Sequence, residues 1–180
     1  MIENIHRRVL HAPADRAGAL LDTLSGPDDR LWPSPAWPPM RLDGPLAPGA
    51  TGGHGPIHYP VEEYRPGSRA RFRFVPPTGV DGTHELSVIP VDAHRVEVRH
   101  TMVIRPTGAM RLAWPLAIRW LHDALLEDLL DTAERELTGT VARPARWSPY
   151  VRLLRSLARR RARRPAPTAS RTAGRTSPTR

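Results

Sequence analysis

The fold is decided by residues 83–104, which read THELSVIPVDAHRVEVRHTMVI. Apolar and polar side chains alternate in both halves of this stretch, as Leu86 and Val88 show in the first half and Val98 in the second. Alternation at every second residue is typical of a strand that buries one of its faces. The stretch therefore predicts two strands, 83–91 and 95–104.

A short turn at 92–94 joins these two strands and sets their antiparallel register. With this turn, Leu86 lies opposite His100, and the apolar faces of the two strands coincide. A slip of one residue would set Leu86 against Arg99 and would turn one strand's side chains to the wrong face. We therefore expect His100 on the buried face of the sheet.

Further strand patterns lie on the N-terminal side of this hairpin. Residues 69–74, RARFRF, alternate arginine with apolar residues and predict a half-buried strand. Another strand near 57–65 carries Tyr59 inward and ends at a Pro-Gly turn. Residues 2–12 alternate more loosely and predict a strand at the start of the chain.

Proline and glycine interrupt the region that follows the first strand. Leucines at helical spacing predict a helix over 14–24, and a second, short helix is expected at 27–31. Residues 32–55 are interpreted as loop with one short strand near 40–42. The Gly-rich segment 49–55 is expected to be a loop, because it lacks the glycine spacing and the following helix of a phosphate-binding motif.

One long amphipathic helix is predicted over 108–137. Its apolar stripe repeats every four residues and includes Leu121 and Leu125, and Gly139 is expected to end it. Pro115 either begins this helix or kinks it. The acidic residues on the flank away from the stripe are expected to face solvent: Asp123, Glu127, Asp128, Asp131 and Glu134.

Charge divides the chain into two parts. All 27 basic residues are arginine; 15 of them lie within residues 1–138, which also hold all 18 acidic residues. The first part therefore has a net charge of −3, and the remainder has a net charge of +12. We expect a folded domain over 1–139 and a basic tail over 140–180 that is helical near 148–163 and otherwise disordered, because its end buries too little apolar surface.

Composition also limits the chemistry and the location that we expect. The sequence contains no cysteine, which excludes disulfides and thiolate metal sites. Arginine without lysine, together with 21 prolines, is typical of a GC-rich bacterial genome. The sequence has neither a signal-peptide pattern nor an apolar run long enough to span a bilayer, so a cytoplasmic protein is expected.

The order of these predicted elements resembles that of the SRPBCC superfamily, which includes START-like lipid-transfer domains, pollen allergens and polyketide cyclases. The likeness extends to the local strings VEEYRPG at 61–67, RARFRF at 69–74, GTHEL at 82–86 and VRHT at 98–101. The resemblance implies an α+β helix-grip fold. In that fold a curved antiparallel sheet wraps around a long C-terminal helix and encloses an apolar cavity.

In such a fold the inward faces of the sheet and of the helix line the cavity. The expected ligand-binding residues are Tyr59, Phe72, Phe74, His84, Leu86, Val98, His100, Met102, Leu121 and Leu125. Most of these side chains are apolar, so the leading hypothesis is a protein that binds a small hydrophobic molecule such as a lipid or a polyketide. Each aromatic residue among them also fits a plain core position.

His84 and His100 are the candidate catalytic residues, because they are predicted on neighbouring strands and on the same face. An inward imidazole can act as a general acid or base, so a polyketide cyclase or dehydratase is the alternative function. No carboxylate is expected on that face, and neither a metal site nor a cofactor is predicted. His122 and Asp123 are neighbours on the long helix and are expected to point in different directions.

The tail supports a third hypothesis. The segment Arg143–Arg164 combines many arginines with Tyr150, Val151, Leu154 and Leu157 at helical spacing. A basic amphipathic segment of this kind can make a weak contact with an anionic membrane or with nucleic acid. A solubilising extension without a partner is the plainer interpretation.

Overall fold

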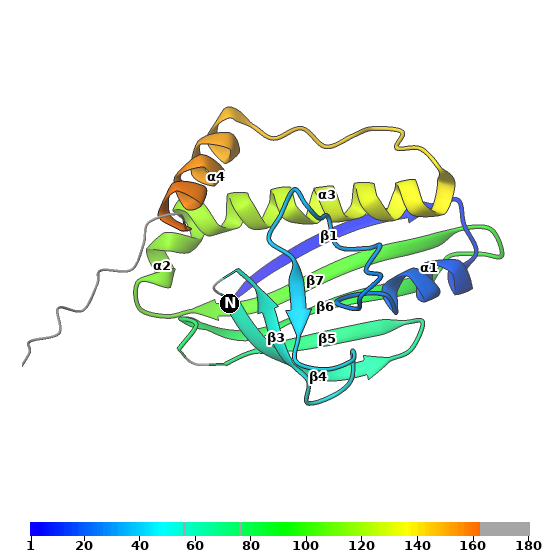
Figure 1. Cartoon of the computed structure of the whole chain (residues 1–180), viewed down its shortest axis with the longest axis horizontal. Helices are drawn as coiled ribbons and strands as arrows, with labels where there is room; N and C mark the ends of the chain where they lie inside the picture. The colour runs from blue at the N-terminus through cyan, green and yellow to red at the C-terminus, as the bar shows by residue number, and fades with distance from the viewer. Residues whose placement is uncertain (56, 76, 163–180) are drawn as a thin grey trace, which may run out of the picture.

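The computed structural model of this chain describes residues 1–55, 57–75 and 77–162. Seven antiparallel strands form one curved sheet in the order β1-β7-β6-β5-β4-β3-β2, and the long helix α3 lies beside it (Figure 1). The strands are β1 (Ile2–Leu10), β2 (Met40–Leu42), β3 (Thr51–His54), β4 (Ile57–Arg65), β5 (Arg69–Phe74), β6 (Val80–Pro90) and β7 (Val96–Pro106). This architecture confirms the predicted α+β helix-grip class.

The register of the central hairpin is the predicted one. Leu86 of β6 lies opposite His100 of β7. On one side β5 sets Phe72 opposite His84, and on the other side β1 sets His6 opposite His100. Because side chains alternate between the faces of a strand, the inward face of the sheet carries three histidines from three different strands.

The helical segments are α1 (Ala14–Leu21), α2 (Met110–Ala113), η1 (Trp114–Ile118), α3 (Arg119–Thr138) and α4 (Pro149–Ala162). The long helical region therefore begins at Met110, and Pro115 lies in η1, a π-helical turn. A widened turn accommodates a proline, which has no N–H to donate to the helical ladder. Gly139 ends α3 with a φ of 83° and donates its N–H to the Arg135 carbonyl at 2.8 Å, as expected.

Two expectations for the Pro- and Gly-rich region are wrong. Residues 27–31 form turns and no helix, because the Asp29 carboxylate accepts hydrogen bonds from three nearby backbone N–H groups. The Gly-rich segment contains the strand β3, which pairs with both β2 and β4. A Cβ at Gly52 would lie 1.9 Å from the Arg41 carbonyl oxygen, so glycine is needed there for the close approach of β2 and β3.

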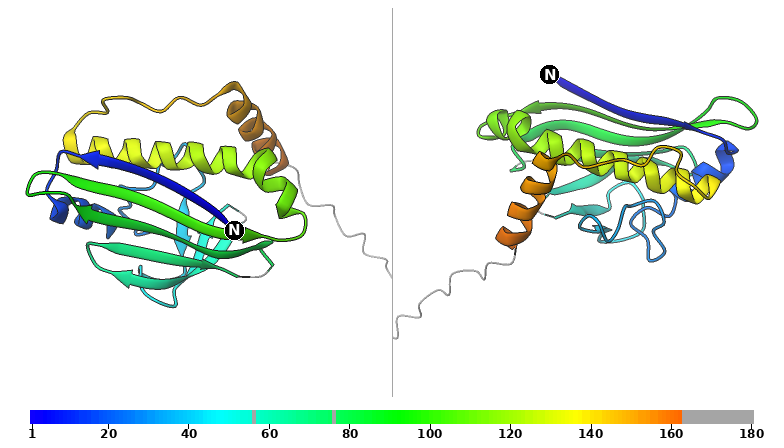
Figure 2. Two further views of the ribbon diagram at one scale, coloured as in Figure 1. Left: turned by 180° about the vertical axis from the view of Figure 1, so that it is seen from behind. Right: turned by 90° about the horizontal axis from the view of Figure 1, so that it is seen from above.

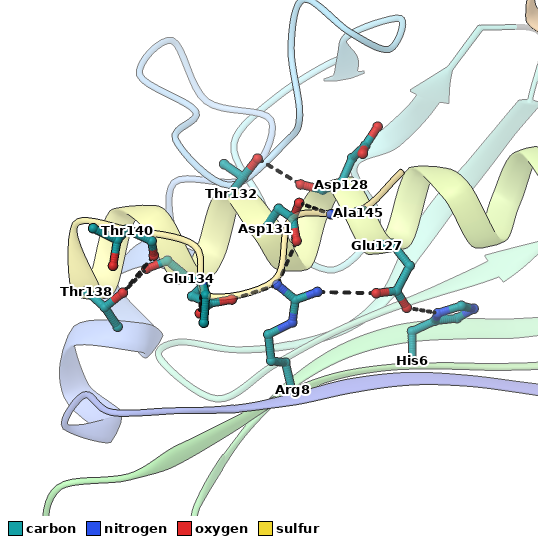
Figure 3. A network of polar contacts seen from close by, with 11 residues as sticks. His6, Arg8, Glu127, Asp128, Asp131, Thr132, Glu134, Thr138, Thr140 and Ala145 are labelled. Atoms are coloured by element: carbon teal, nitrogen blue, oxygen red, sulfur yellow. Dashed lines mark hydrogen bonds and ion pairs between the residues drawn. The ribbon is translucent and has the colours of Figure 1, made fainter. Parts of the chain in front are cut away.

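The acidic side chains of α3 that were expected to face solvent contact other parts of the chain, which corrects that expectation. Asp123, Glu127, Asp131 and Glu134 face β1, whereas Asp128 accepts hydrogen bonds from the indoles of Trp37 and Trp147. Alternation along β1 turns Arg8 inward, and Figure 3 shows its side chain directed at α3. Its guanidinium donates hydrogen bonds of 2.7–3.2 Å to the carboxylates of Glu127, Asp131 and Glu134. Asp131 is only 7% exposed. The partners are more than 115 residues apart in sequence, so no local pattern indicated this contact.

The segment after α3 returns along that helix, and α4 packs beside its N-terminal end (Figures 1 and 2). The Trp147 indole donates to the Asp128 carboxylate at 2.9 Å. The Arg155 guanidinium lies over the rings of Trp37 and Trp147, 4.1 and 3.7 Å from their centroids. The division into a domain and a tail at residue 139 stays a prediction, and the C-terminal end that was predicted to be disordered lies outside the described residues.

Replacing Arg8 by methionine should lower the free energy of unfolding by about 3 kcal/mol. The change keeps most of the apolar stem but leaves the Asp131 and Glu134 carboxylates without their cation, and these side chains are only 10% and 13% exposed. Urea denaturation measures the effect. Arg7→Met is the matched control, because Arg7 is 64% exposed and its ion pair with Glu97 is long, at 3.8 Å. Equal losses in both variants would contradict a buried ionic contact between β1 and α3.

Candidate functional site

A continuous row of aromatic rings crosses the inner side of the sheet. Neighbouring ring centroids along it are 4.5–6.3 Å apart. Its members, called the ring row below, are Trp32, His54, Tyr59, His84, His100, His122 and His6. The row passes over β3, β4, β6 and β7 and ends between α3 and β1.

Apolar rings pack around the middle of the ring row. Phe72 stacks on His84 with a centroid distance of 5.0 Å and an angle of 19° between the planes, and Phe74 lies 4.9 Å from the same imidazole. Tyr59 is 1% exposed and contacts all three rings. These positions follow from strand alternation, because each of these side chains leaves its strand on the inward face.

The two predicted catalytic histidines contact each other. Nε2 of His100 lies 3.4 Å from Nδ1 of His84, within hydrogen-bonding distance. Burial, and to a smaller degree nearby histidines, lowers the pKa of both imidazoles well below their usual range. Burial also lowers the pKa of His54, to about 4. The inner part of the ring row is therefore uncharged at neutral pH.

Several polar atoms of the ring row are buried and have no hydrogen-bond partner within the described part of the chain. They are Tyr59 Oη, His84 Nε2, His100 Nδ1 and His122 Nδ1. Buried polar atoms in folded proteins nearly always have a partner, and an unsatisfied one costs about 1–3 kcal/mol. Four such atoms on one row of rings mark a place where the interior can accept hydrogen bonds from, or donate them to, another molecule.

The outer end of the ring row is charged. His6 contacts Glu127 through Nδ1 at 2.8 Å and Asp123 through Nε2 at 3.2 Å. Burial alone would lower the pKa of His6, but the two carboxylates outweigh it and raise the pKa to about 9. Asn4 donates a further hydrogen bond of 2.9 Å to Asp123, whose pKa is held far below its usual range by these contacts although burial opposes it.

The residues predicted to line the site all face the interior, but the structure brings only some of them together. Tyr59, Phe72, Phe74, His84 and His100 form one cluster of rings. Leu86, Val98 and Leu125 belong to the main apolar core, with Leu121 packed at its edge, and Met102 packs in a smaller cluster with Ile104 and Trp114.

Sequence reasoning missed the outer half of the ring row. It placed His122 and Asp123 in different directions, yet both reach the same point beside His6, with 3.8 Å between His122 Nδ1 and Asp123 Oδ1. Adjacent helix residues can flank one side chain of a neighbouring strand. His6 lies opposite His100 because β1 pairs with β7, a pairing that the residue pattern of the first strand does not indicate.

Two surface hollows of about 150 and 380 Å³ occur in the described part of the chain. The smaller is lined by α1 and the end of α3, and the larger by Ala36, Asp128 and the returning segment around Trp147. Neither involves the ring row. The space between the sheet and α3, where the sequence predicted a cavity, is occupied by side chains such as Phe72, Met102 and Leu129, each 1% exposed or less.

Comparison with known proteins identifies the fold of this chain but neither its family nor its function. No family model matches the chain, and no curated protein matches it. Among solved structures, 188 chains match.

One of these is a Thermobifida fusca protein solved by NMR, with 19% identity over 76% of this chain and 95% of that chain and a TM-score of 0.55. Truncated norcoclaurine synthase from Thalictrum flavum has 12% identity, coverage of 74% and 92%, and a TM-score of 0.56. The Aha1 dimer from Colwellia psychrerythraea has 14% identity, coverage of 77% and 98%, and a TM-score of 0.53.

Replacing His84 by phenylalanine should reduce the loss of stability in acid. The folded protein holds the pKa of His84 well below 6.5, so the unfolded chain binds this proton first as the pH falls. Below pH 6.5 such an imidazole should therefore lower the free energy of unfolding by up to about 1.4 kcal/mol for each pH unit. His84→Phe removes this imidazole, so the free energy of unfolding of the variant should fall less steeply as the pH falls. Urea denaturation over the range from about pH 7.5 to 5 measures the slope.

The matched control for this prediction is His58→Phe, because His58 is an exposed histidine on β4. It makes the same chemical change outside the ring row, so the difference in slope between the two variants reports on His84. If His84→Phe and His58→Phe gave the same slope as the natural chain, His84 would titrate in the folded protein as it does in the unfolded one.

Proposed function

We propose that the protein belongs to the SRPBCC superfamily and binds a small molecule between its sheet and α3. The molecule would combine an apolar body with a hydroxyl or carbonyl group. One observation carries this proposal: Tyr59 Oη, His84 Nε2 and His100 Nδ1 are buried on adjoining rings and have no hydrogen-bond partner among residues 1–55, 57–75 and 77–162. The fold, with its inward-facing apolar side chains, supports it.

The polar group of the ligand would satisfy these atoms. A phenolic hydroxyl can donate a hydrogen bond or accept one, and a neutral imidazole offers one nitrogen as donor and the other as acceptor. Tyr59 and His84 are in ring contact, so one hydroxyl or carbonyl oxygen of a ligand that reaches this pair could serve both. Each satisfied atom recovers part of the about 1–3 kcal/mol that its burial costs.

The surroundings favour an uncharged ligand. Phe72, Phe74 and Leu86 supply apolar surface beside the unsatisfied atoms, and burial keeps His84 and His100 neutral. Arg8, which points inward, is engaged by three carboxylates. Occupation requires buried side chains such as Phe72 and Met102, each 1% exposed, to make room for the ligand.

Binding is favoured over the cyclase or dehydratase alternative. A general base works best when its pKa lies near the working pH. The pKa of His84 and of His100 lies well below that range, so each would accept a proton poorly and donate one rarely. Norcoclaurine synthase shares the fold at 12% identity, which carries no activity over to this chain.

Tyr59→Phe should separate the cost of the buried hydroxyl to the stability of the free protein from its contribution to ligand binding. Without ligand, the variant should be more stable by about 1 kcal/mol, because it loses an unsatisfied polar atom. With ligand, it should show a smaller rise in melting temperature than the natural chain. The probes are 2-naphthol and naphthalene, which share an apolar body and differ by one hydroxyl. Only the response to 2-naphthol should depend on Tyr59.

Tyr64→Phe is the matched control, because the Tyr64 hydroxyl already donates to Asp22 at 2.8 Å outside the ring row. It should leave the naphthol response unchanged. Stabilisation by neither probe, or a destabilised Tyr59→Phe without ligand, would contradict the proposal. The second result would mean that internal water satisfies the hydroxyl.

A second candidate function is docking on an anionic membrane surface, and an exposed apolar patch favours it. It lies where the start of α4 meets η1 and the start of α3: the Tyr150 hydroxyl donates to the Leu116 carbonyl, and the rings of Tyr150 and Trp120 are 5.8 Å apart. The exposed apolar side chains of these helical segments, called the helical patch below, are 41–71% exposed; they are Leu112, Leu116, Trp120, Tyr150, Leu153 and Leu157.

The charge around the helical patch is entirely positive in sequence. No acidic residue occurs between Glu97 and Asp123, or after Glu136. Exposed arginines flank the apolar side chains on both helical segments, Arg111 and Arg152 among them. Apolar side chains rimmed by arginines fit a surface of anionic lipid headgroups. None of the described helices is both long and apolar enough to cross a membrane.

The double variant Leu112→Asp/Leu153→Asp should weaken binding of the full chain to phosphatidylserine-containing vesicles at least about 10-fold, because two leucines lose their insertion into the interface. Cosedimentation with vesicles measures the affinity. The matched control is Val91→Asp, since Val91 is 47% exposed at the opposite end of the sheet. Unchanged vesicle binding in the double variant, or binding to duplex DNA alone, would contradict membrane docking.

A further inference from the structure

Three metal-ligating groups meet at the outer end of the ring row. They are Nε2 of His6, Nδ1 of His122 and Oδ1 of Asp123, and all three atoms lie within 4.8 Å of one another. The carboxylate oxygen is 3.2 Å from the His6 nitrogen and 3.8 Å from the His122 nitrogen. Ligand atoms about 2.0–2.1 Å from a tetrahedral zinc ion lie about 3.3 Å apart. The His6 and Asp123 atoms already have this separation, and the two pairs that include His122 need to approach by about 1.5 Å or less.

The lone pairs that a metal needs are not all taken by the protein. Nδ1 of His122 is buried, and none of the residues that the structure describes forms a hydrogen bond with it. The two oxygens of the Asp123 carboxylate have different partners: Oδ2 contacts Arg119 at 3.4 Å, and Oδ1 faces the histidines. A buried imidazole nitrogen without a partner, directed at a carboxylate oxygen 3.8 Å away, leaves room for an ion between them.

The supporting contacts are those of a metal centre. A histidine that binds a metal usually directs its other ring nitrogen at a carboxylate or a carbonyl, which orients the ring. His6 has this arrangement, because its Nδ1 lies 2.8 Å from Glu127 Oε1. Glu127 is held in turn by Arg8 at 3.2 Å, and Asn4 donates to Asp123 at 2.9 Å.

We propose that His6, His122 and Asp123 bind a divalent transition-metal ion, with Glu127 and Asn4 as positioning residues. Two imidazoles and one carboxylate favour zinc and its first-row neighbours over magnesium or calcium, which prefer sites made of oxygen atoms. Three protein ligands leave at least one coordination position for water or for a ligand oxygen. The sequence predicts no metal site, because no carboxylate is expected on the face that carries His84 and His100.

A rival arrangement uses the same residues without a metal. A protonated His6 between Asp123 and Glu127 would be a purely structural ion pair. The two arrangements differ at His122, which a metal requires and the ion pair does not. The metal site also stands apart from ligand binding between the sheet and α3, because neither Tyr59 nor His84 belongs to it.

The test is calorimetric titration of the full, tag-free chain with zinc after treatment with a chelator. The natural chain should bind one zinc ion, and zinc-edge X-ray absorption should show two imidazole nitrogens at about 2.0 Å. Glu127→Gln changes a positioning residue and should weaken zinc binding about 10- to 100-fold. His122→Ala removes a ligand and should weaken zinc binding more than that. Cobalt bound at the same site should absorb visible light as a four- or five-coordinate ion, which the variant should not reproduce.

The matched control is His58→Ala, which removes an exposed histidine and should leave zinc binding unchanged. Circular dichroism and urea denaturation of each variant verify the fold, and His122→Gln replaces His122→Ala if the latter does not fold. Absence of stoichiometric zinc binding to the natural chain would overturn the proposal. Equal zinc affinity in the folded His122 variant and the His58 control would also overturn it, and the ion pair would then account for these residues.

Discussion

The ionic contact between β1 and α3 is the constraint on which the rest of the structure depends. Asp131 and Glu134 are almost free of solvent, and carboxylates in that position need a cation within hydrogen-bonding distance. Arg8 provides it from the inward face of an edge strand. This contact fixes the rotation of α3 about its axis, so the adjoining apolar stripe with Leu125 and Leu129 must face the middle of the sheet. The aromatic interior is enclosed as a consequence.

The ring row is a departure from the composition that stability alone would favour. Four polar atoms without partners lie along it, although apolar side chains of similar size would fill the same space at no such cost. A sequence keeps such a conflict where function requires it. The row also changes character along its length, from neutral imidazoles near Phe72 to the charged surroundings of His6. The inner end suits a neutral polar group, and the outer end suits a cation.

The predictable part of the fold is the part encoded by neighbouring residues. The turn after β6 is so short that Leu86 can face only His100 without exposing an apolar side, and the register followed from that. β1 gave no such signal, because Ile5 and Val9 on its outer face are apolar and yet 47% and 49% exposed. Its inward face could therefore not be chosen from the pattern, and the partners of the α3 carboxylates remained hidden with it.

In the described part of the segment after Gly139, α4 packs against α3 through contacts that the composition does not indicate. Arg155 is 7% exposed and stacks on two tryptophans. A count of charged residues cannot distinguish such a buried arginine from an exposed one. Val151 on the same side of α4 is also buried, so this face of the helix is already packed on the domain. Leu153 and Leu157 are more than half exposed and add nothing to that packing. They belong instead to the exposed surface that is proposed above to dock on an anionic membrane.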